Sequence, residues 1–392
     1  MWTRGQVRRA GRAYIGTRLA LAISGISRLL TNRIYFDHAA TTPVIGPARD
    51  AFLRGIEGWS NPNSPHGEGR AARALLEEAR ETLKVALDWR HDVIFTSGAS
   101  ESVEIVGKRA CVAGRAYGAS EHAIVPFAMG DDAAVLPVDG EGLIDEAALE
   151  AVLANGPALV AIQQVNNETG IVQPLERIAA TIRAAGSLLL ADCAQGASKM
   201  PLPDADFIAI CAHKLGGPPG IGALLVRDLG TLSPCGGGQE KGYRRGTQDV
   251  PGALAFAAAL VAKPYDMARM AELRARLEKG AKAVGASVIG EDAPRAATIG
   301  AISLPGATSA SLLVQLDLSG IAVSAGSACA SGKAKASHVL AAMNVPEDVA
   351  AGFLRLSFGP DTNEAEVDTF LTEYGRIAAR LGANVSGKSR AA

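Results

Sequence analysis

The chain has 392 residues, and its 39 Lys and Arg almost balance its 40 Asp and Glu, giving a formal net charge of −1. This balance argues against a nucleic-acid-binding protein, which needs a basic excess. Hydrophobic residues make up 48% of the chain, which excludes global disorder, and no apolar run reaches the roughly 18 residues of a membrane-spanning helix, so we expect no membrane partner.

The first 36 residues carry seven Arg and no acidic residue before Asp37. An Arg-rich, acid-poor start is typical of an organelle transit peptide, but it also fits a basic surface helix or an upstream start codon. We expect residues 1–33 to form a disordered extension of a cytoplasmic protein, with the transit peptide as the minor alternative. The role of this extension stays open.

After Asp37, helical and strand patterns alternate along the chain. Apolar residues at helical spacing predict the helices 68–87, 176–185, 269–284 and 364–381. Short apolar runs predict the strands 92–96, 158–164, 187–191, 207–210 and 222–226. This alternation predicts an α/β fold whose mostly parallel sheet has helices on both faces and binds its ligand at the carboxyl ends of the strands.

The character of the sequence changes near residues 262–264, where the charged helical patterns of a second segment begin. We therefore predict a large domain over residues 34–262, whose first residues cross to the smaller domain. A small α/β domain over residues 263–392 would carry the segment around Cys329.

Lys214 follows a predicted strand, comes directly after His213, and precedes the run 216–220, which contains only Gly and Pro. A lysine in a strand-end loop is usually a solvated surface charge. The constrained setting favours instead a partly desolvated amine, which is a usable nucleophile and base. An imine with an aldehyde cofactor is the leading hypothesis.

Asp192 ends an apolar strand, with Gln195 three residues later. Asp192 either caps the next helix or pairs with a cationic ligand atom such as a pyridinium nitrogen. The segment 97–100 lies at a strand–helix junction, where backbone N–H groups favour a phosphate. The Gly- and Arg-containing segment 236–247 is either a second anion-binding loop or a flexible surface loop.

The five cysteines show no C-x-x-C spacing, so we expect neither a disulfide framework nor a structural zinc site. A lone cysteine is commonly a small buried hydrophobe. Cys329 differs because residues 324–332 are almost wholly Gly, Ala and Ser, which favours a mobile loop and a nucleophilic thiol. Arg355, in the apolar stretch 353–357, is expected to bind a carboxylate, either in a structural salt bridge or from a substrate.

Together these motifs resemble the cysteine desulfurases of the NifS/IscS type, in the class V aminotransferase branch of the pyridoxal phosphate (PLP) enzymes. The similarity runs from about Ile34 to Arg380, and the order and spacing of the motifs agree throughout. The motifs are Asp37-His-Ala-Ala-Thr-Thr42, Asn61-Pro-Asn-Ser64 with His66, Thr96-Ser-Gly-Ala-Ser-Glu101, Glu121-His122, Asn166-Asn-Glu-Thr-Gly170, Asp192-Cys-Ala-Gln195, His213-Lys214, Gly236-Gly-Gly-Gln-Glu240, Arg244-Arg-Gly-Thr247, 324–331 and Ser337-His-Val-Leu340.

The resemblance implies the PLP-dependent transferase fold type I, with a mostly parallel, seven-stranded-type sheet, in a homodimer with sites at the subunit interface. It implies pyridoxal 5′-phosphate as cofactor, with His122 stacked on the ring, Asp192 at the ring nitrogen and Thr247 reaching in from the second subunit. The implied cofactor-binding residues are Ala99, Ser100, His122, Asn166, Asp192, Gln195, His213, Lys214 and Thr247. The implied catalytic residues are Lys214, His122 and Cys329, and the implied substrate-binding residues are Asn61 and Arg355.

The implied reaction removes sulfur from L-cysteine and yields L-alanine and a persulfide on Cys329. The partner is an iron–sulfur scaffold or another acceptor for thio-cofactor assembly, and the sequence does not identify it. No metal is expected for catalysis, and Cys329 would meet a cluster only transiently.

Three alternatives stay open. A selenocysteine lyase would keep all of these residues, so the sequence does not separate it from a cysteine desulfurase. Another class V aminotransferase would not need the thiol of Cys329. An inactive scaffold for iron–sulfur assembly would need none of these residues.

The chain departs from the family pattern at two positions. Cys211 stands where Ser or Thr usually helps hold the phosphate, and a thiol is the weaker donor, so we expect lower cofactor affinity. Ala336 stands where Pro is common, which should loosen the loop.

Overall fold

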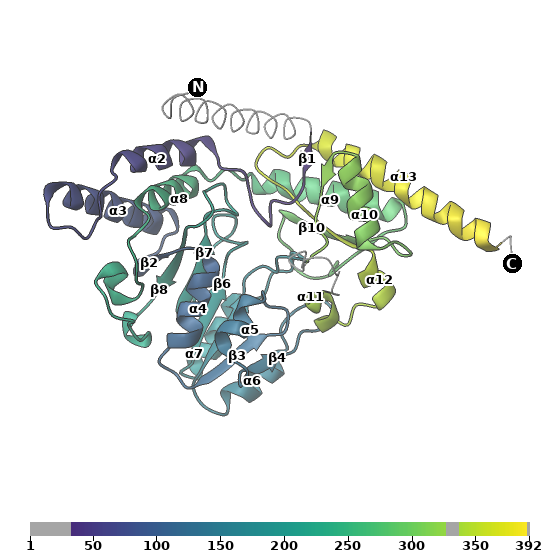
Figure 1. Cartoon of the computed structure of the whole chain (residues 1–392). Helices are drawn as coiled ribbons and strands as arrows, with labels where there is room; N and C mark the ends of the chain where they lie inside the picture. Colours follow the sequence, from purple (N-terminus) through teal and green to yellow (C-terminus); the bar gives the residue numbers. More distant parts are fainter. Residues whose placement is uncertain (1–32, 327–336, 390–392) are drawn as a thin grey trace, which may run out of the picture.

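The structure is a computed structural model that describes residues 33–326 and 337–389 (Figure 1). The expected basic extension up to residue 32, together with Cys329 and Ala336, lies outside the described residues. None of the described helices is both long and apolar enough to cross a membrane.

The largest sheet within the described residues has seven strands in the order β2-β8-β7-β6-β5-β3-β4. They are β2 (Asp92–Thr96), β3 (Gly114–Gly118), β4 (Ala134–Leu136), β5 (Ala158–Gln163), β6 (Leu188–Asp192), β7 (Phe207–Cys211) and β8 (Gly222–Val226). The expected α/β fold with a mostly parallel sheet is confirmed. Only β8 runs against its neighbours, β2 and β7. The connection 212–221 contains no crossover helix, which a parallel pairing of β7 and β8 would need.

The strands are apolar on both faces because helices cover both sides of the sheet. In β5, Leu159 and Ala161 pack with side chains of α4 and α5, whereas Val160 and Ile162 belong to the core that includes α7 and α8. This alternation follows from the two-residue period of a strand. The helices around the sheet are α2 (Gly46–Glu57), α3 (Gly67–Ala86), α4 (Ala99–Arg109), α5 (Ile124–Met129), α6 (Glu146–Leu153), α7 (Leu175–Ala184) and α8 (Val250–Ala262).

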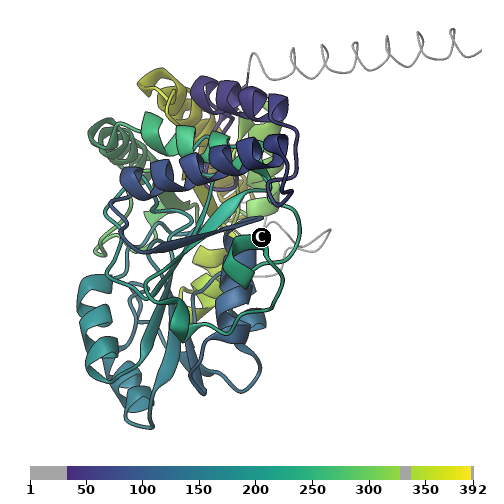
Figure 2. The same ribbon diagram turned by 90° about the vertical axis from the view of Figure 1, so that its left-hand side faces the viewer.

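Helices α2 and α3 both pack against α8, and in Figure 2 they lie nearest the viewer. Gly55 makes this approach possible. A side chain at this position would place its Cβ 2.5 Å from the Cα of Pro251 in α8. Helices α2 and α3 are thereby held against α8, the helix that follows the last strand of the large sheet.

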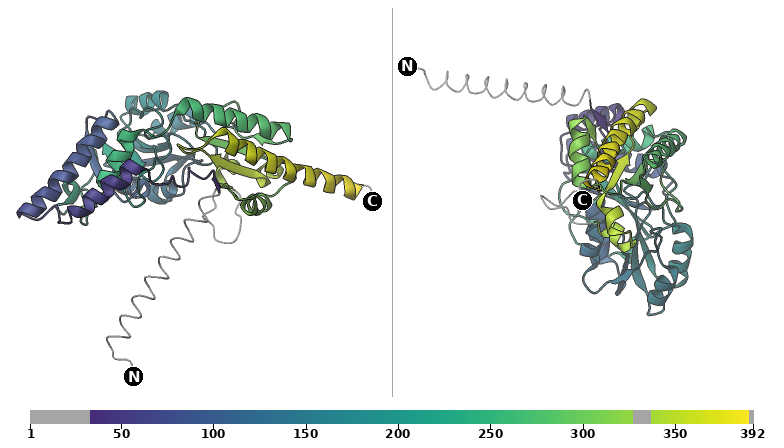
Figure 3. Two further views of the ribbon diagram at one scale, coloured as in Figure 1. Left: turned by 90° about the horizontal axis from the view of Figure 1, so that it is seen from above. Right: turned by 90° about the vertical axis from the view of Figure 1, so that its right-hand side faces the viewer.

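A second hydrophobic core forms from the C-terminal part of the chain and Phe36. Its sheet has the order β12-β10-β9, and the N-terminal β1 pairs in parallel with β11, so the start of the chain crosses to this part. Figure 3 shows α3 and α13 at opposite ends of the molecule. The elements are β1 (Ile34–Tyr35), α9 (Met267–Ala283), β9 (Ser287–Val288), β10 (Ile299–Ser303), α10 (Ser309–Leu318), β11 (Ile321–Ala322), α11 (His338–Ala342), α12 (Glu347–Ala351), β12 (Phe353–Ser357) and α13 (Glu364–Ser389).

Candidate active site

A cavity of about 680 Å³ lies at the carboxyl ends of the parallel strands. Its walls come from the segments that follow β2, β3, β5, β6 and β7, from residues 37–41, and from the segments at Gly326, His338 and Arg355. Parallel strands bring their carboxyl ends to one edge, which is where such sheets bind ligands. The predicted site residues that line it are Ala99, Ser100, His122, Asp192, Gln195, His213, Lys214 and Arg355.

The N-terminus of α4 forms one wall of the cavity. Ala99 and Ser100 are its first two residues, and both line the cavity. Before the helix begins, the N–H of Ser97 donates to the Glu101 carboxylate at 2.5 Å. Arg244 Nε donates to the same carboxylate at 2.9 Å. The free N–H groups and positive dipole end of an 11-residue helix therefore face a space suited to an anion.

Asp192 and Lys214 line the same cavity from neighbouring strands, β6 and β7. Asp192 Oδ1 accepts a hydrogen bond from the N–H of Ala194 at 2.9 Å, which fixes the carboxylate at the strand end. The main chain at Lys214 is held through its carbonyl oxygen, which lies 3.4 Å from the hydroxyl of Thr42. The arrangement presents an amine and a carboxylate to one ligand.

His122 begins the turn into α5 and is exposed toward the cavity. Its Nδ1 accepts from the N–H of Ile124 at 3.3 Å. Burial lowers the pKa of His122, the charge of Asp192 opposes this shift, and Lys214 and His338 add to it. Because the net direction is downward, the imidazole is neutral at physiological pH.

His213 and Cys211 lie beside Lys214 on the strand-end segment of β7. Burial and the charge of Lys214 lower the pKa of His213 to about 4. Burial raises the pKa of the Cys211 thiol, whose Sγ lies 4.0 Å from His213 Nε2. Both side chains line the cavity as neutral groups.

Asn166 is not among the residues that line the cavity, and its contact with the ligand stays a prediction. Its side chain is buried and its Nδ2 donates to Ser120 O at 3.0 Å. Its Oδ1 accepts from the N–H groups of Glu168 and Thr169, each at 2.9 Å, whereas Nδ2 makes one of its two possible hydrogen bonds to described residues. The next residue, Asn167, lines the cavity. Gln195 also lines it, with its Nε2 donating to Ala39 O at 2.8 Å.

Arg355 reaches the cavity from β12, and its side chain is only 5% exposed. Its Nη2 pairs with Asp37 Oδ1 at 2.5 Å and its Nη1 donates to Asn167 O at 2.9 Å. Its Nε is buried without a partner among the described residues. A buried guanidinium N–H without an acceptor is costly unless a ligand supplies one, and a carboxylate is the fitting ligand.

Asn61 and Thr247 lie outside this cavity. Both are exposed, and a chain of contacts joins their segments. Asn61 Oδ1 accepts from Asn63 Nδ2 at 3.1 Å, and the same Nδ2 lies 2.8 Å from Gln248 Oε1. The segments of Asn61 and Thr247 are therefore in contact, but neither residue lines the cavity of its own chain.

The structure adds residues to which the sequence assigned no role. Asp37, Glu168 and His338 line the cavity, and each belongs to one of the motifs quoted above. Membership of those motifs was the only available signal, because nothing local distinguishes these side chains from ordinary surface charges. Cys329, the proposed nucleophile, is outside the described residues.

A family model described as aminotransferase class V matches residues 34–370. The chain is 35% identical over 376 residues to a cysteine desulfurase of Cereibacter sphaeroides, covering 90% of this chain and 97% of the relative. It is 36% identical over 381 residues to an IscS-like cysteine desulfurase of Mycobacterium tuberculosis, covering 88% and 96%.

Solved structures agree with these relatives. A NifS-like protein of Rickettsia africae superimposes with a TM-score of 0.82 at 27% identity, over 88% of this chain and 99% of that one. SspA, solved in complex with cysteine, superimposes with a TM-score of 0.73 at 29% identity, over 83% and 99%.

Proposed function

We propose that this chain, which belongs to the class V aminotransferase family and is a cysteine desulfurase of the NifS/IscS type, works in the cavity that Lys214 lines. The proposed reaction removes sulfur from L-cysteine and gives L-alanine. The observation that carries this proposal is the meeting of four features in one cavity: the amine of Lys214, the carboxylate of Asp192, the imidazole of His122 and the N-terminus of α4. The similar protein SspA was solved in complex with cysteine, which supports L-cysteine as the ligand.

The residues of the cavity fit pyridoxal 5′-phosphate. A helix N-terminus suits its phosphate, a fixed carboxylate suits its protonated ring nitrogen, and an amine suits its aldehyde. When bound, this cofactor supplies an electron sink for the bonds at the α-carbon of the amino acid. The residues that would hold it are Ala99, Ser100, His122, Asn166, Asp192, Gln195, His213 and Lys214, and Asn167 also lines the cavity.

Three groups of the chain do the work around that cofactor. Lys214 Nζ takes the α-proton of the substrate and later returns it, acting as general base and acid. Asp192 would pair with the ring nitrogen, and the hydrogen bond from the N–H of Ala194 holds the carboxylate at the strand end. Arg355 binds the substrate carboxylate, which the unpartnered Nε supports.

We further propose that Cys329 takes the sulfur as a persulfide and passes it to an acceptor protein for iron–sulfur or thio-cofactor assembly. The name IscS of a relative that is 32% identical supports this direction of transfer. The acceptor itself stays unidentified, and a cytoplasmic location stays a prediction from the sequence.

The enzyme is proposed to be a homodimer whose site is completed by the partner. Asn61 and Thr247 share an exposed surface away from their own cavity, which supports their serving the cavity of a second copy. The two cores support the proposed division into a large domain over residues 34–262 and a small domain over residues 263–392.

The test is the formation of alanine and sulfide from L-cysteine in the presence of dithiothreitol. The wild type should make both in equal amounts, and Cys329→Ala should lose sulfide formation. Cys111→Ala is the matched control, because Cys111 is exposed and does not line the cavity. Sulfide formation by Cys329→Ala at the wild-type rate would remove Cys329 from the reaction. No alanine from the wild type would overturn the proposed function.

A further inference from the structure

The cation that we propose for the substrate carboxylate already has a carboxylate of the chain beside it. Arg355 Nη2 lies 2.5 Å from Asp37 Oδ1, and both residues line the active-site cavity. The side chain of Arg355 is only 5% exposed, whereas that of Asp37 is 27% exposed. A ligand carboxylate bound at Arg355 would therefore meet a second negative charge at Asp37, a residue to which the proposed function gives no role.

The other carboxylates on the cavity wall have different partners within the described part of the chain. Glu101 pairs with another cation, and Glu168 and Asp192 accept hydrogen bonds from neutral groups. Asp37 is the acid that pairs with Arg355 among the residues that the structure describes. The carboxylate that a ligand meets at this cation is thus identified by a direct contact.

The contact between Asp37 and Arg355 is held from both sides. The hydroxyl of Tyr35 donates to the carbonyl oxygen of Asp37 at 3.1 Å, and the main chain at Asp37 pairs with Ser357. Arg355 is the middle residue of β12, and its Nη1 donates to Asn167 O at 2.9 Å. Because main chain and side chains are fixed together, the negative charge of Asp37 is part of the cavity wall before a ligand enters.

This charge opposes the binding of a carboxylate. Two carboxylates against one guanidinium repel each other, and the repulsion is stronger at a partly buried site than in water. L-Cysteine and L-alanine carry the same α-carboxylate, which takes no part in the bond changes. A tight hold on such a group strengthens the binding of substrate and product alike without raising kcat. A competing charge in the cavity weakens that hold and favours release of the product.

We propose that Asp37 is a specificity-determining residue, which weakens the hold of Arg355 on the α-carboxylate that L-cysteine and L-alanine share. Arg355 selects ligands with a carboxylate, and the negative charge of Asp37 limits how strongly they bind. A ligand that is neutral at this position is not repelled by Asp37. This inference rests on the proposed function.

The test compares two ligands that differ only in the charge at the carboxyl position, L-alanine and L-alaninamide. Asp37→Asn keeps an oxygen that accepts from Arg355 and removes the negative charge. The dissociation constant of each ligand is measured by isothermal titration calorimetry on the holoenzyme. Asp50→Asn is the matched control, because Asp50 is an exposed acid that pairs with Arg49 and does not line the cavity. Asp37→Ser, which also removes the charge, is the second variant if Asp37→Asn does not fold.

Asp37→Asn should bind L-alanine about 10-fold more tightly than the wild type, or more, and L-alaninamide within about twofold of it. Asp37→Ser should change the ratio of the two affinities in the same direction, and Asp50→Asn should leave it unchanged. An equal gain for both ligands would overturn the proposal, because the charge of the ligand would then make no difference. Unchanged or weaker binding of L-alanine would also overturn it, because Asp37 would then only orient Arg355.

Failure of the proposed function has a separate sign. A wild type that forms no alanine from L-cysteine would contradict the proposed function, whereas the two dissociation constants are measured without desulfuration.

Discussion

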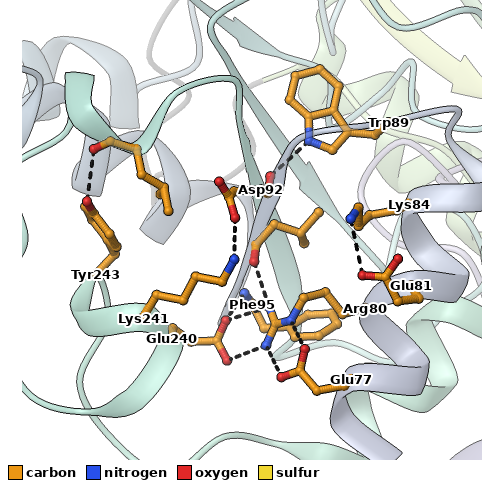
Figure 4. A network of polar contacts seen from close by, with 12 residues as sticks. Glu77, Arg80, Glu81, Lys84, Trp89, Asp92, Phe95, Glu240, Lys241 and Tyr243 are labelled. Atoms are coloured by element: carbon orange, nitrogen blue, oxygen red, sulfur yellow. Dashed lines mark hydrogen bonds and ion pairs between the residues drawn. The ribbon is translucent and has the colours of Figure 1, made fainter.

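In the cluster around Arg80, each N–H group of a buried guanidinium has an acceptor, whereas the buried Nε of Arg355 in the active-site cavity has none among the described residues. Arg80 donates to Glu77, to Val93 O and to both carboxylate oxygens of Glu240 (Figure 4). Glu240 Oε2 also accepts from the N–H of Phe95 at 2.8 Å.

The difference separates a structural cluster from a functional one. In the Arg80 cluster the protein supplies every partner, so the cluster ties α3, β2 and the turn at Gln239–Gly242 together. In the cavity, the Nε of Arg355 keeps a hydrogen bond that a ligand can accept. Breaking the first should lower the free energy of unfolding, and breaking the second should lower activity.

The largest expected effect is on activity, from Lys214→Ala. Loss of this amine should reduce alanine formation by on the order of 10⁴-fold, because it is the proposed attachment point and the base. The visible absorption that depends on the bond between lysine and the aldehyde cofactor should disappear after dialysis. The free energy of unfolding of the cofactor-free protein should change by less than about 1 kcal/mol.

Lys108→Ala, on the surface of α4, is the control and should keep the absorption. An unchanged spectrum in Lys214→Ala would remove this lysine from the mechanism. A large loss in the free energy of unfolding would instead mean that Lys214 stabilises the fold, and the proposed difference between the Arg80 cluster and the cavity would not hold.

Glu240→Gln tests the structural cluster. The substitution removes a buried charge and turns an amide N–H₂ toward the donors of Arg80, so we expect a loss of about 3–5 kcal/mol in the free energy of unfolding. Urea unfolding measures it. Glu81→Gln is the matched control, because its pair with Lys84 in the same view is solvent-exposed and should contribute little (Figure 4). If the two variants lose the same free energy of unfolding, the hydrogen bonds of the Arg80 cluster contribute no more to stability than an exposed ion pair.

His38 sharpens the comparison, because its buried Nδ1 also lacks a partner among the described residues, yet it does not line the cavity. Burial, with a contribution from the charge of Lys199, lowers the pKa of His38 from 6.5 to about 4. The unfolded chain therefore binds a proton between pH 6.5 and pH 4 that the folded chain refuses. Stability should fall through this window by roughly 3 kcal/mol from this residue.

His38→Phe should flatten that pH dependence, which urea unfolding at pH 7.5, 5.5 and 4.5 would measure. Part of the fall should remain, because the pKa of His213 is also lowered to about 4. Parallel stability curves for the wild type and His38→Phe would show that His38 does not titrate as its burial requires.

Much of the fold was predictable from local pattern. Strands buried on both faces give continuous apolar runs, and the bounds of β2 and β8 match the predicted 92–96 and 222–226. The predicted helix 364–381 begins where α13 begins but ends eight residues earlier. Gly382 directly follows the predicted end, and glycine commonly marks a helix stop, but α13 continues through Gly382 and Gly387.

The site was predictable where a residue's position at a strand end decides its role, as for Asp192 and Lys214. It was not predictable where the turn decides which neighbour faces inward. Asn166 and Asn167 have the same side chain, and only the folded turn shows that Asn166 is buried and that Asn167 lines the cavity. Arg80 and Glu240 are 160 residues apart, so nothing in either local sequence indicated their pairing.

The smallest expected effect is on cofactor affinity, from a substitution of Cys211. This residue shares features of both regions, because it is buried and also lines the cavity. A hydroxyl is a stronger donor than a thiol, so Cys211→Ser should bind pyridoxal 5′-phosphate more tightly by about 0.5–1.5 kcal/mol, or roughly 2- to 13-fold. Titration of the cofactor-free protein, followed by visible absorption, measures this affinity. Cys193→Ser, at a buried thiol that does not line the cavity, should bring no gain. A weaker affinity for Cys211→Ser would mean that the new hydroxyl finds no phosphate oxygen and stays an unpaired buried group, which would assign Cys211 to the core.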